Sequence, residues 1–531
     1  MSLRGADACV GPLGPLGPLA APVRARLEAL QRERVVERLW AADHTLWSEQ
    51  PDEITNRLGW LELDAEMADE AAAIEGFARS VADEGYGTAV LLGMGGASLA
   101  PAVLGSVLGS RRRGLRLQVL ATTDPSAIRA AASRLDLART LFIASSKSGT
   151  TIETRALLDY FWSLAPDGRH FVAITDAGTP LDRLGRERRF RRVFAHSSDN
   201  GPLRGGANVG GRYSALSYFG LVPAALAGAP LGELLARARA MRERCGPTVP
   251  TAGNPGAWLG AVLGEAALAG RDKLTLVLPD ELAVLGAWLE QLVAESTGKD
   301  GRGIVPVNGE PLGTPAVYGE DRLFAAIEDA GAPRLARLER AGQPVVRLST
   351  SDRAAVGGEC YRWEFATAIA GHILGVHPFN QPNVQEAKQA TQRILDEPRP
   401  AAVTRRPADL LATLRAGDYI SLQAYARPTP RLRTLLQAVR IRLRDRHRVA
   451  TTVGYGPALL HSTGQLHKGG PGTGIFLVYV PEDRSDLEIP GRAYSFGELK
   501  RAQALADLDC LQAHDRRVSR VTCRELEALA C

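Results

Sequence analysis

The sequence has few lysines, few aromatic residues, no paired cysteines and no long apolar run. Only six of its 64 basic residues are lysines, so arginine is the usual cation. The six cysteines are dispersed without a CxxC pair, which fits reduced cytosolic thiols better than a disulfide framework or a zinc site. The most apolar segment, residues 215–236, is interrupted by prolines, glycines and a glutamate, which favours a buried helical core over a membrane span.

The sequence also has little excess of one charge over the other. The net charge of +5 is small against 64 basic and 59 acidic residues. This excess is too slight and too scattered to indicate binding to nucleic acid or to an anionic membrane. The balance of 45% hydrophobic and 23% charged residues is that of an ordinary globular protein with enough material for a core.

Most of the chain alternates short apolar strands with glycine-containing turns and amphipathic helices. Four such units follow one another in about a hundred residues from residue 88: "TAVLLGMGGASL", "LRLQVLATTDPSAI", "RTLFIASSKSGTTIET" and "HFVAITDAGTPLDRL". A second set begins near residue 254. Repeated strand–helix units predict parallel sheets covered by helices. The sequence therefore predicts an α/β protein with three α/β regions, of which the first two are similar in plan.

Composition shifts give the expected boundaries of these regions. The N-terminus has Gly-Pro-Leu triplets and no signal-peptide pattern, and a proline-rich stretch precedes the last region. The expected segments are a flexible leader (1–22), a helical segment (23–84), a first and a second α/β subdomain (85–240 and 241–395), a linker (396–412) and a C-terminal α/β region (413–531).

The turn "SSKSGTT" combines four hydroxyl groups with one of the six lysines. Because it joins a strand to a helix, its free backbone N–H groups lie at the positive end of the helix dipole and form an anion site. Its hydroxyl groups can donate to phosphate oxygens, and its lysine adds charge; they belong to Ser146, Lys147, Ser148, Thr150 and Thr151. The composition predicts a phosphomonoester site, whereas the competing interpretation is an ordinary N-cap cluster.

Three other turns carry candidate residues. In "GMGGAS" the spacing is not GxGxxG, so Gly95 and Gly96 indicate either a ligand resting on the backbone or close strand–helix packing. Arg212 in "VGGRYS" is either a cation that stabilises developing negative charge or a surface residue. Glu295 ends an apolar helix before "STGK", where it is either a general base or a solvated helix-end carboxylate.

Taken together and in this order, five stretches resemble the sequence blocks of the phosphoglucose isomerase family: "GMGGASLAP", "ASSKSGTTIET", "VGGRYS", "ESTGK" and "HPFNQPNVQEAK". The resemblance covers roughly residues 85–395. The flanks, including "TTVGYGPALLHSTGQLHKGG", are similar to the isomerase portion of transaldolase fusion proteins. The resemblance implies two sugar-isomerase (SIS) subdomains, a sugar-phosphate substrate, no metal or other cofactor, and a cytoplasmic homodimer that interconverts glucose 6-phosphate and fructose 6-phosphate.

The resemblance also implies roles for individual residues. Glu295 matches the base that moves a proton between C1 and C2 through a cis-enediol, and Arg212 matches the cation that stabilises this intermediate. Lys388 matches a lysine that assists ring opening. The residues that match substrate and phosphate contacts are Ser146, Lys147, Ser148, Thr151, Gln291 and Gln381.

Two positions depart from the family pattern. Ala97 stands where the family has a serine that touches the substrate. The best match to the block with the ring-opening histidine is "YGEDRLF", which has Asp321 at that place, and Glu153 matches the carboxylate that pairs with the histidine. Either Asp321 and Glu153 share a proton, or a histidine comes from elsewhere in the chain. The candidates are His377, His461 and His467, the last two of which can equally be packed or solvated turn residues.

Other functions remain open at this point. SIS folds also bind sugar phosphates without catalysis, as sensing modules. Glu295 combined with Lys388 favours an enzyme, and a sensor needs no base and should carry a DNA-binding segment, which the sequence does not show. An isomerase that also acts on mannose 6-phosphate is a further alternative, as is an enzyme altered by the changes at Ala97 and Asp321.

Overall fold

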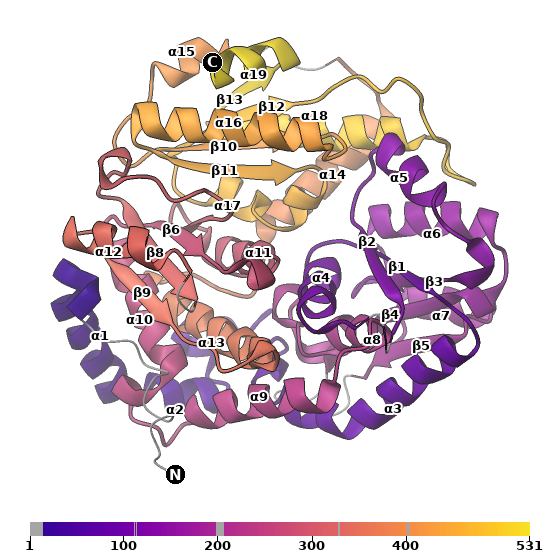
Figure 1. Cartoon of the computed structure of the whole chain (residues 1–531), viewed down its shortest axis with the longest axis horizontal. Helices are drawn as coiled ribbons and strands as arrows, with labels where there is room; N and C mark the ends of the chain where they lie inside the picture. Colours follow the sequence, from indigo (N-terminus) through magenta and orange to yellow (C-terminus); the bar gives the residue numbers. More distant parts are fainter. Residues whose placement is uncertain (1–13, 111, 113, 198–205, 328–329, 401–403) are drawn as a thin grey trace.

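A computed structural model describes residues 14–110, 112, 114–197, 206–327, 330–400 and 404–531 (Figure 1). Its strands form three sheets in which all pairs are parallel, and each sheet begins with the order second, first, third, fourth strand. The first sheet is β2-β1-β3-β4-β5, with β1 (Thr88–Gly93), β2 (Arg116–Leu120), β3 (Thr140–Ser145), β4 (Phe171–Asp176) and β5 (Arg192–His196).

The second and third sheets have four strands each. The second is β7-β6-β8-β9, with β6 (Lys273–Val277), β7 (Val305–Val307), β8 (Arg322–Ile327) and β9 (Val345–Leu348). The third is β11-β10-β12-β13, with β10 (Tyr419–Ala424), β11 (Ala450–Tyr455), β12 (Gly474–Tyr479) and β13 (Arg517–Val521). In Figure 1 the third sheet, in orange and yellow, lies above the other two.

The helices before and around the first sheet are α1 (Ala20–Arg32), α2 (Val35–Trp40), α3 (Leu63–Asp83), α4 (Gly96–Leu108), α5 (Pro125–Ala132), α6 (Ile152–Leu164), α7 (Pro180–Glu187), α8 (Tyr218–Leu226) and α9 (Leu231–Arg244). Those that follow are α10 (Pro255–Leu268), α11 (Leu285–Thr297), α12 (Ala332–Arg340), α13 (Val356–Leu374), α14 (Pro382–Asp396), α15 (Pro407–Leu411), α16 (Pro430–His447), α17 (Gly464–Gly469), α18 (Phe496–Ala513) and α19 (Cys523–Ala530).

Both faces of the first sheet are buried, which explains its continuous apolar strands. Successive side chains of a strand point to opposite faces. Leu91 and Ile143 face a large core that also contains residues of the second sheet, such as Leu274. Phe142 and Phe171 face a second core under α6. The first two sheets therefore share one core, and the predicted α/β class with two SIS-type sheets, an N-terminal helical segment and a C-terminal α/β region is confirmed.

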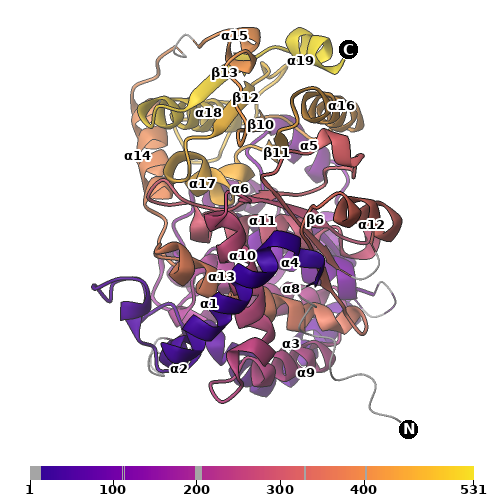
Figure 2. The same cartoon turned by 90° about the vertical axis from the view of Figure 1, so that its left-hand side faces the viewer.

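The C-terminal region has its own core and is joined to the rest by α14. Ala387, Ala390 and Ile394 of this helix pack against Ala502 and Ala506 of α18. Figure 2 shows α14 at the left, rising from the second region toward α18. The helix that ends the predicted second subdomain is thus packed on the C-terminal region.

Two predicted irregular segments are partly structured. In the expected flexible leader, a 3₁₀ helix over Gly14–Leu19 leads into α1, and Leu16 and Leu19 are buried, because they extend the apolar stripe of α1. Residues 1–13 lie outside the described residues. The expected linker contains α15, whose Leu410 and Leu411 are buried under the third sheet, and its residues 401–403 are not described. Among the described residues, no helix is both long and apolar enough to cross a bilayer.

The strand order determines where a ligand can bind. In a parallel sheet of this order, a crevice lies outside the carboxyl ends of the strands at the point where the connections change direction. In the first sheet this point lies between β1 and β3. The turns that leave these two strands are "GMGG" and "SSKSGTT". The chemistry-bearing turns therefore share one edge of the sheet.

Candidate active site

A buried carboxylate–guanidinium pair lies at the centre of the candidate site. Glu295, near the end of α11, is 5% exposed, and its Oε1 lies 3.2 Å from Nη1 of Arg212. Arg212 is 2% exposed; its Nε donates to Ser296 Oγ at 2.7 Å, and its Nη1 donates to Gln381 Oε1 at 3.0 Å. Its Nη2 donates to the Pro378 carbonyl oxygen at 2.6 Å. Arg212 is therefore not a surface cation, and it can stabilise an oxyanion formed beside Glu295.

Gln291 joins this pair to the glycine turn. Its Nε2 donates to Glu295 Oε2 and to the His461 carbonyl oxygen, both at 2.9 Å. Gly95 has φ +56°, and a Cβ there would lie 2.9 Å from Gln291 Nε2. A Cβ at Gly96 would lie 1.8 Å from the Gly211 carbonyl oxygen. Both glycines are therefore closely packed, and a side chain at either position would displace the segments that carry Gln291 and Arg212.

The hydroxyl-rich turn faces a cavity of about 260 Å³. Ser146 Oγ and Thr151 Oγ1 share a hydrogen bond of 2.8 Å, and Ser148 Oγ and Thr150 Oγ1 share one of 2.9 Å. Ser148, Thr150 and Thr151 line the cavity at the start of α6, and the exposed Lys388 of α14 lines it from the other side. This wall offers hydroxyls, a helix N-terminus and an ammonium group, which is suitable chemistry for a phosphomonoester.

Lys147 is directed away from this cavity. Its Nζ is paired with the carboxylate of Asp176 at the end of β4, and it donates to the Ala207 carbonyl oxygen at 2.7 Å. Burial lowers the pKa of the Lys147 ammonium, and the nearby Asp176 opposes this effect only in part. Among the residues that line the cavity, Lys388 is the lysine that remains for a ligand.

A histidine–carboxylate pair lies at the same cavity. Nε2 of His461, at the end of the 3₁₀ helix Ala458–His461, is 2.8 Å from Oε1 of Glu153 in α6. Both residues line the cavity. Although burial acts to raise the pKa of Glu153, the charge and hydrogen bond of His461 outweigh it and hold this pKa below its usual value. Glu153 therefore gives the His461 imidazole a fixed hydrogen-bond partner at the wall of the cavity.

Gln503 is a buried residue of this cavity that sequence reasoning missed. Its Nε2 donates to Glu153 Oε1 at 2.6 Å, and it comes from α18 in the C-terminal region. The sequence around it, "RAQALADLD", is that of an ordinary packed helix. No local signal marks Gln503, because its role depends on how α18 packs on the first sheet.

Of the two alternatives for the ring-opening acid, the one in which Asp321 pairs with Glu153 disagrees with the structure. Asp321 directly precedes β8, so it lies at the amino end of a strand, whereas the site lies at carboxyl ends. It lines a different cavity, with Arg271 and Arg448, and its carbonyl oxygen accepts from the Lys273 N–H. A match of short sequence blocks cannot distinguish the two ends of a strand. The histidine that pairs with Glu153 in the structure is His461 of the C-terminal region.

The other two candidate histidines are engaged elsewhere. Nε2 of His377 donates to the Asp52 carbonyl oxygen at 3.1 Å, and its Nδ1 accepts from the Phe379 N–H. It shapes the loop whose carbonyls hold Arg212. His467 is 3% exposed in the core of the third sheet, and Gln423 donates to its Nδ1. Burial lowers the pKa of His467 well below its usual value. Ala97 is half-buried against the large core.

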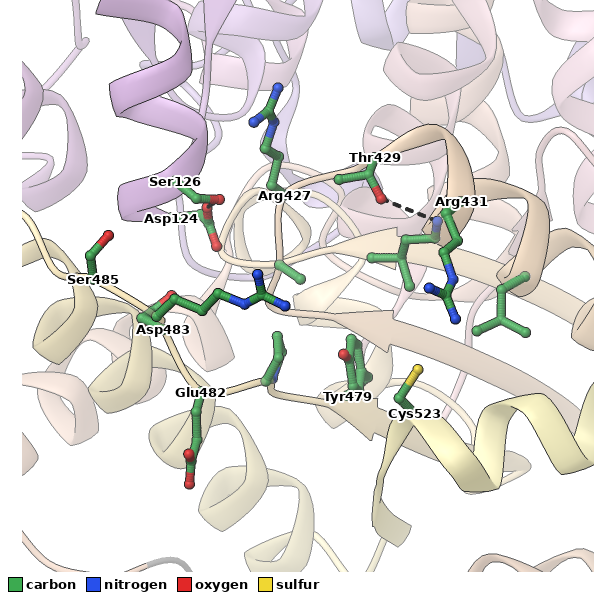
Figure 3. A pocket seen from close by; sticks show the side chains of 15 residues that line it. Asp124, Ser126, Arg427, Thr429, Arg431, Tyr479, Glu482, Asp483, Ser485 and Cys523 are labelled. Carbon is green, nitrogen blue, oxygen red and sulfur yellow. Dashed lines mark hydrogen bonds between the residues drawn. The ribbon is translucent and has the colours of Figure 1, made fainter.

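A separate cavity of about 390 Å³ lies at the corresponding edge of the third sheet (Figure 3). It is bounded by the start of α16, the segment after β12, and Asp124 and Ser126 of the first subdomain. Figure 3 shows Arg427 and Arg431 near its rim, together with the carboxylates of Glu482 and Asp483. None of the residues expected to form the active site lines this cavity.

Fold and geometry together define an SIS-type α/β protein with a site at the carboxyl edge of its first sheet. The chain belongs to the phosphoglucose isomerase family. The family model "Phosphoglucose isomerase" matches residues 76–320. The chain is 30% identical over 396 residues to glucose-6-phosphate isomerase of Citrifermentans bemidjiense, and 34% identical over 393 residues to that of a Geobacter species. Each alignment covers 63% of this chain and 72% of the relative.

Two solved structures share the fold of this chain. A hypothetical protein from Thermus thermophilus is 26% identical with a TM-score of 0.58, and the match covers 70% of this chain and 96% of that one. A glucose-6-phosphate isomerase from Chlamydia trachomatis has a TM-score of 0.52 at 20% identity, covering 68% and 78% of the two chains. The second likeness shows the fold alone.

Proposed function

We propose that this protein is an aldose–ketose isomerase that interconverts glucose 6-phosphate and fructose 6-phosphate. The observation that carries this proposal is the buried Glu295, held by Arg212 and Gln291 beside the turns of the first sheet. Membership of the phosphoglucose isomerase family and relatives that are named glucose-6-phosphate isomerase support the same reaction.

In this proposal the phosphate binds to the hydroxyl groups of Ser148, Thr150 and Thr151, near Lys388. His461 donates a proton to the ring oxygen while Glu153 holds the imidazole, and the anomeric hydroxyl loses its proton as the C1 carbonyl forms. Glu295 then removes the proton from C2 of the open aldose and returns it to C1, and the proton of the C2 hydroxyl moves to O1, so that the carbonyl passes from C1 to C2. The negative charge of the enediolate lies next to the guanidinium of Arg212, where it is stabilised by charge and by hydrogen bonding.

The test replaces the base and retains its shape. Glu295→Gln should leave substrate binding nearly intact and lower turnover by roughly 10²–10⁴. The measurement is a coupled assay for fructose 6-phosphate, run with and without a chelator, together with solvent deuterium appearing at C2 of glucose 6-phosphate. Near-normal turnover of the variant would refute the assignment of the base.

A broader substrate range is a second possibility that one residue favours. Ala97 lacks the hydroxyl group that the family resemblance leads us to expect at this place. A cis-enediol has no stereocentre at C2, so return of the proton to the opposite face gives mannose 6-phosphate. An assay with mannose 6-phosphate, repeated on Ala97→Ser, tests whether the smaller side chain widens the range of substrates.

We further propose a cytoplasmic homodimer, most like the isomerase portion of transaldolase fusion proteins. The family resemblance and the flanking sequence around His461 support this proposal. Analytical ultracentrifugation of the purified chain tests the oligomeric state, and a monomer at micromolar concentration would contradict it.

A further inference from the structure

Three buried polar side chains and the half-buried His461 form a continuous chain of hydrogen bonds between the first subdomain and the C-terminal region. Thr123 Oγ1 donates to Gln503 Oε1 at 2.9 Å, Gln503 Nε2 donates to Glu153 Oε1 at 2.6 Å, and His461 Nε2 is 2.8 Å from the same Oε1. Thr123 and Glu153 belong to the first subdomain, whereas Gln503 and His461 belong to the C-terminal region. Each of these three bonds joins a residue of the first subdomain to a residue of the C-terminal region.

The orientation of the Gln503 amide is fixed from both sides. The Thr123 hydroxyl donates to Oε1, which leaves the Nε2 hydrogens for the carboxylate. A reversed amide would place its oxygen against Glu153 and would be repelled. Gln503 is 2% exposed, so water does not compete for these bonds. One turn earlier on α18, the buried Lys500 pairs with Asp124 at 3.0 Å and fixes the helix against the first subdomain.

The carboxylate of Glu153 depends on few donors. His461 and Gln503 both bond to Oε1, and Oε2 has no hydrogen-bond partner among the described residues. The charged or titratable groups near it are His461, Lys388 of α14 and Tyr494, which precedes α18. Gln503 thus supplies one of the two side-chain hydrogen bonds to the ionised carboxylate, and it does so as a neutral group at any pH.

We infer that Gln503 is a positioning residue for ring opening: its amide holds the Glu153 carboxylate in the orientation that presents His461 to the sugar ring oxygen. This inference rests on the proposed isomerase function. Gln503 acts through Glu153 and moves no proton itself. Because Gln503 lies on α18, His461 is placed correctly only while α18 is packed on the first subdomain.

The experiment replaces Gln503 by methionine, which has a similar length and no amide. Gln512→Met, in the last turn of the same helix, is the matched control. Thr123→Val removes the donor that orients the amide. With glucose 6-phosphate, we expect Gln503→Met to lower turnover about tenfold, less than the loss of an acid itself, with a KM within about twofold of wild type. Thr123→Val should have a smaller effect in the same direction.

Two readouts separate positioning from a general loss of structure. Without the amide, the Glu153 carboxylate is less stabilised, so the acid limb of the pH profile should move to higher pH. The second readout uses 5-deoxyfructose 6-phosphate, which has no O5 and stays open. Because this substrate needs no ring opening, Gln503→Met should convert it at nearly the wild-type rate.

The outcomes are distinguishable. If the wild-type protein converts neither substrate, the proposed function fails. If the wild-type protein is active and Gln503→Met has unchanged turnover and pH profile, the inference on Gln503 is wrong. Equal slowing of both substrates would also overturn it, because the defect would then not lie in ring opening.

Discussion

Arg212 and Glu295 show how burial raises the free-energy cost of removing one partner of an ion pair. On the surface such a pair contributes little to stability, about 0–1 kcal/mol. Here both side chains are almost completely buried, and the guanidinium also holds Ser296, Gln381 and the loop carbonyls. Removing one partner leaves an uncompensated buried charge, which typically costs about 3–5 kcal/mol. This cost applies to a substitution at either residue, so the Tm of each variant must be measured beside its turnover. Arg212 also holds these other groups, whereas Glu295→Gln keeps an oxygen that can accept from the guanidinium, so Glu295→Gln disturbs fewer contacts.

The two lysines of the phosphate region should respond differently to alanine. Lys388 is exposed and lines the cavity. Lys388→Ala should therefore lower kcat/KM about tenfold or more with an unchanged Tm. Lys147→Ala leaves Asp176 without its ammonium partner, which should lower the Tm, as expected for about 1–3 kcal/mol of lost stability. Steady-state kinetics and thermal melts of both variants measure this difference.

A double variant provides the control. Lys147→Ala with Asp176→Asn removes both charges, so it should recover much of the lost Tm. A large rise in the KM of the double variant for glucose 6-phosphate, with a normal Tm, would contradict the view that Lys147 serves Asp176 and would return this lysine to phosphate binding.

Sequence motifs located candidate site residues most directly where residues that are close in the sequence are also close in the structure. Glu295 and Gln291 share one helix, and the hydroxyl turn is contiguous, so their order in the sequence is also their order in space. His461 was one of several candidates, because nothing in its own segment indicates contact with Glu153. Gln503 had no signal for the same reason.

At the scale of elements, α11 carries a second carboxylate, at Glu290. Burial raises the pKa of Glu290 to about 8. A raised pKa means that the folded state binds a proton that the unfolded state releases above its ordinary pKa, about 4.5. Stability therefore falls as the pH rises from about 4.5 to about 8. Glu290→Gln should raise the Tm by on the order of 2 °C at the upper end of this window, and by less below it.

Thermal melts of wild type and Glu290→Gln at several pH values between these limits measure the effect. The exposed Glu281→Gln, in the segment before α11, is the control and should show no such trend. A Tm difference that is the same across the window would mean that Glu290 is ionised throughout it.

Strands were easier to predict than the short irregular segments. A strand such as β3, "TLFIAS", is buried along its whole length and therefore has a continuous apolar sequence. The stretch around α15 has the prolines of a linker, but Pro407 stands at the first helical position, where proline is compatible with a helix. Composition alone could not show that Leu410 and Leu411 find a partner surface on the third sheet.

At the scale of the whole molecule, one chain supplies every group of the proposed mechanism. Glu295 comes from the second region, the hydroxyl turn from the first, and His461 and Gln503 from the C-terminal region. We therefore expect that co-expressed Glu295→Gln and His461→Ala chains do not restore each other's activity, because each site contains one defect.

The measurement is the specific activity of the mixed preparation, with each variant alone and wild type as references. A site shared between subunits would give some mixed dimers one intact site, so recovery of a substantial fraction of wild-type activity would contradict a site formed within one chain.

The packing of α14 along α18 has a last consequence. This helix carries Lys388, and the C-terminal region against which it packs carries His461 and Gln503. A rigid-body rotation of that region would shift all three side chains together relative to the base. A rotation that opens the cleft to admit a sugar would therefore also move Lys388, His461 and Gln503 away from Glu295. The proposed catalytic groups would be correctly placed only while the C-terminal region is closed over the bound substrate.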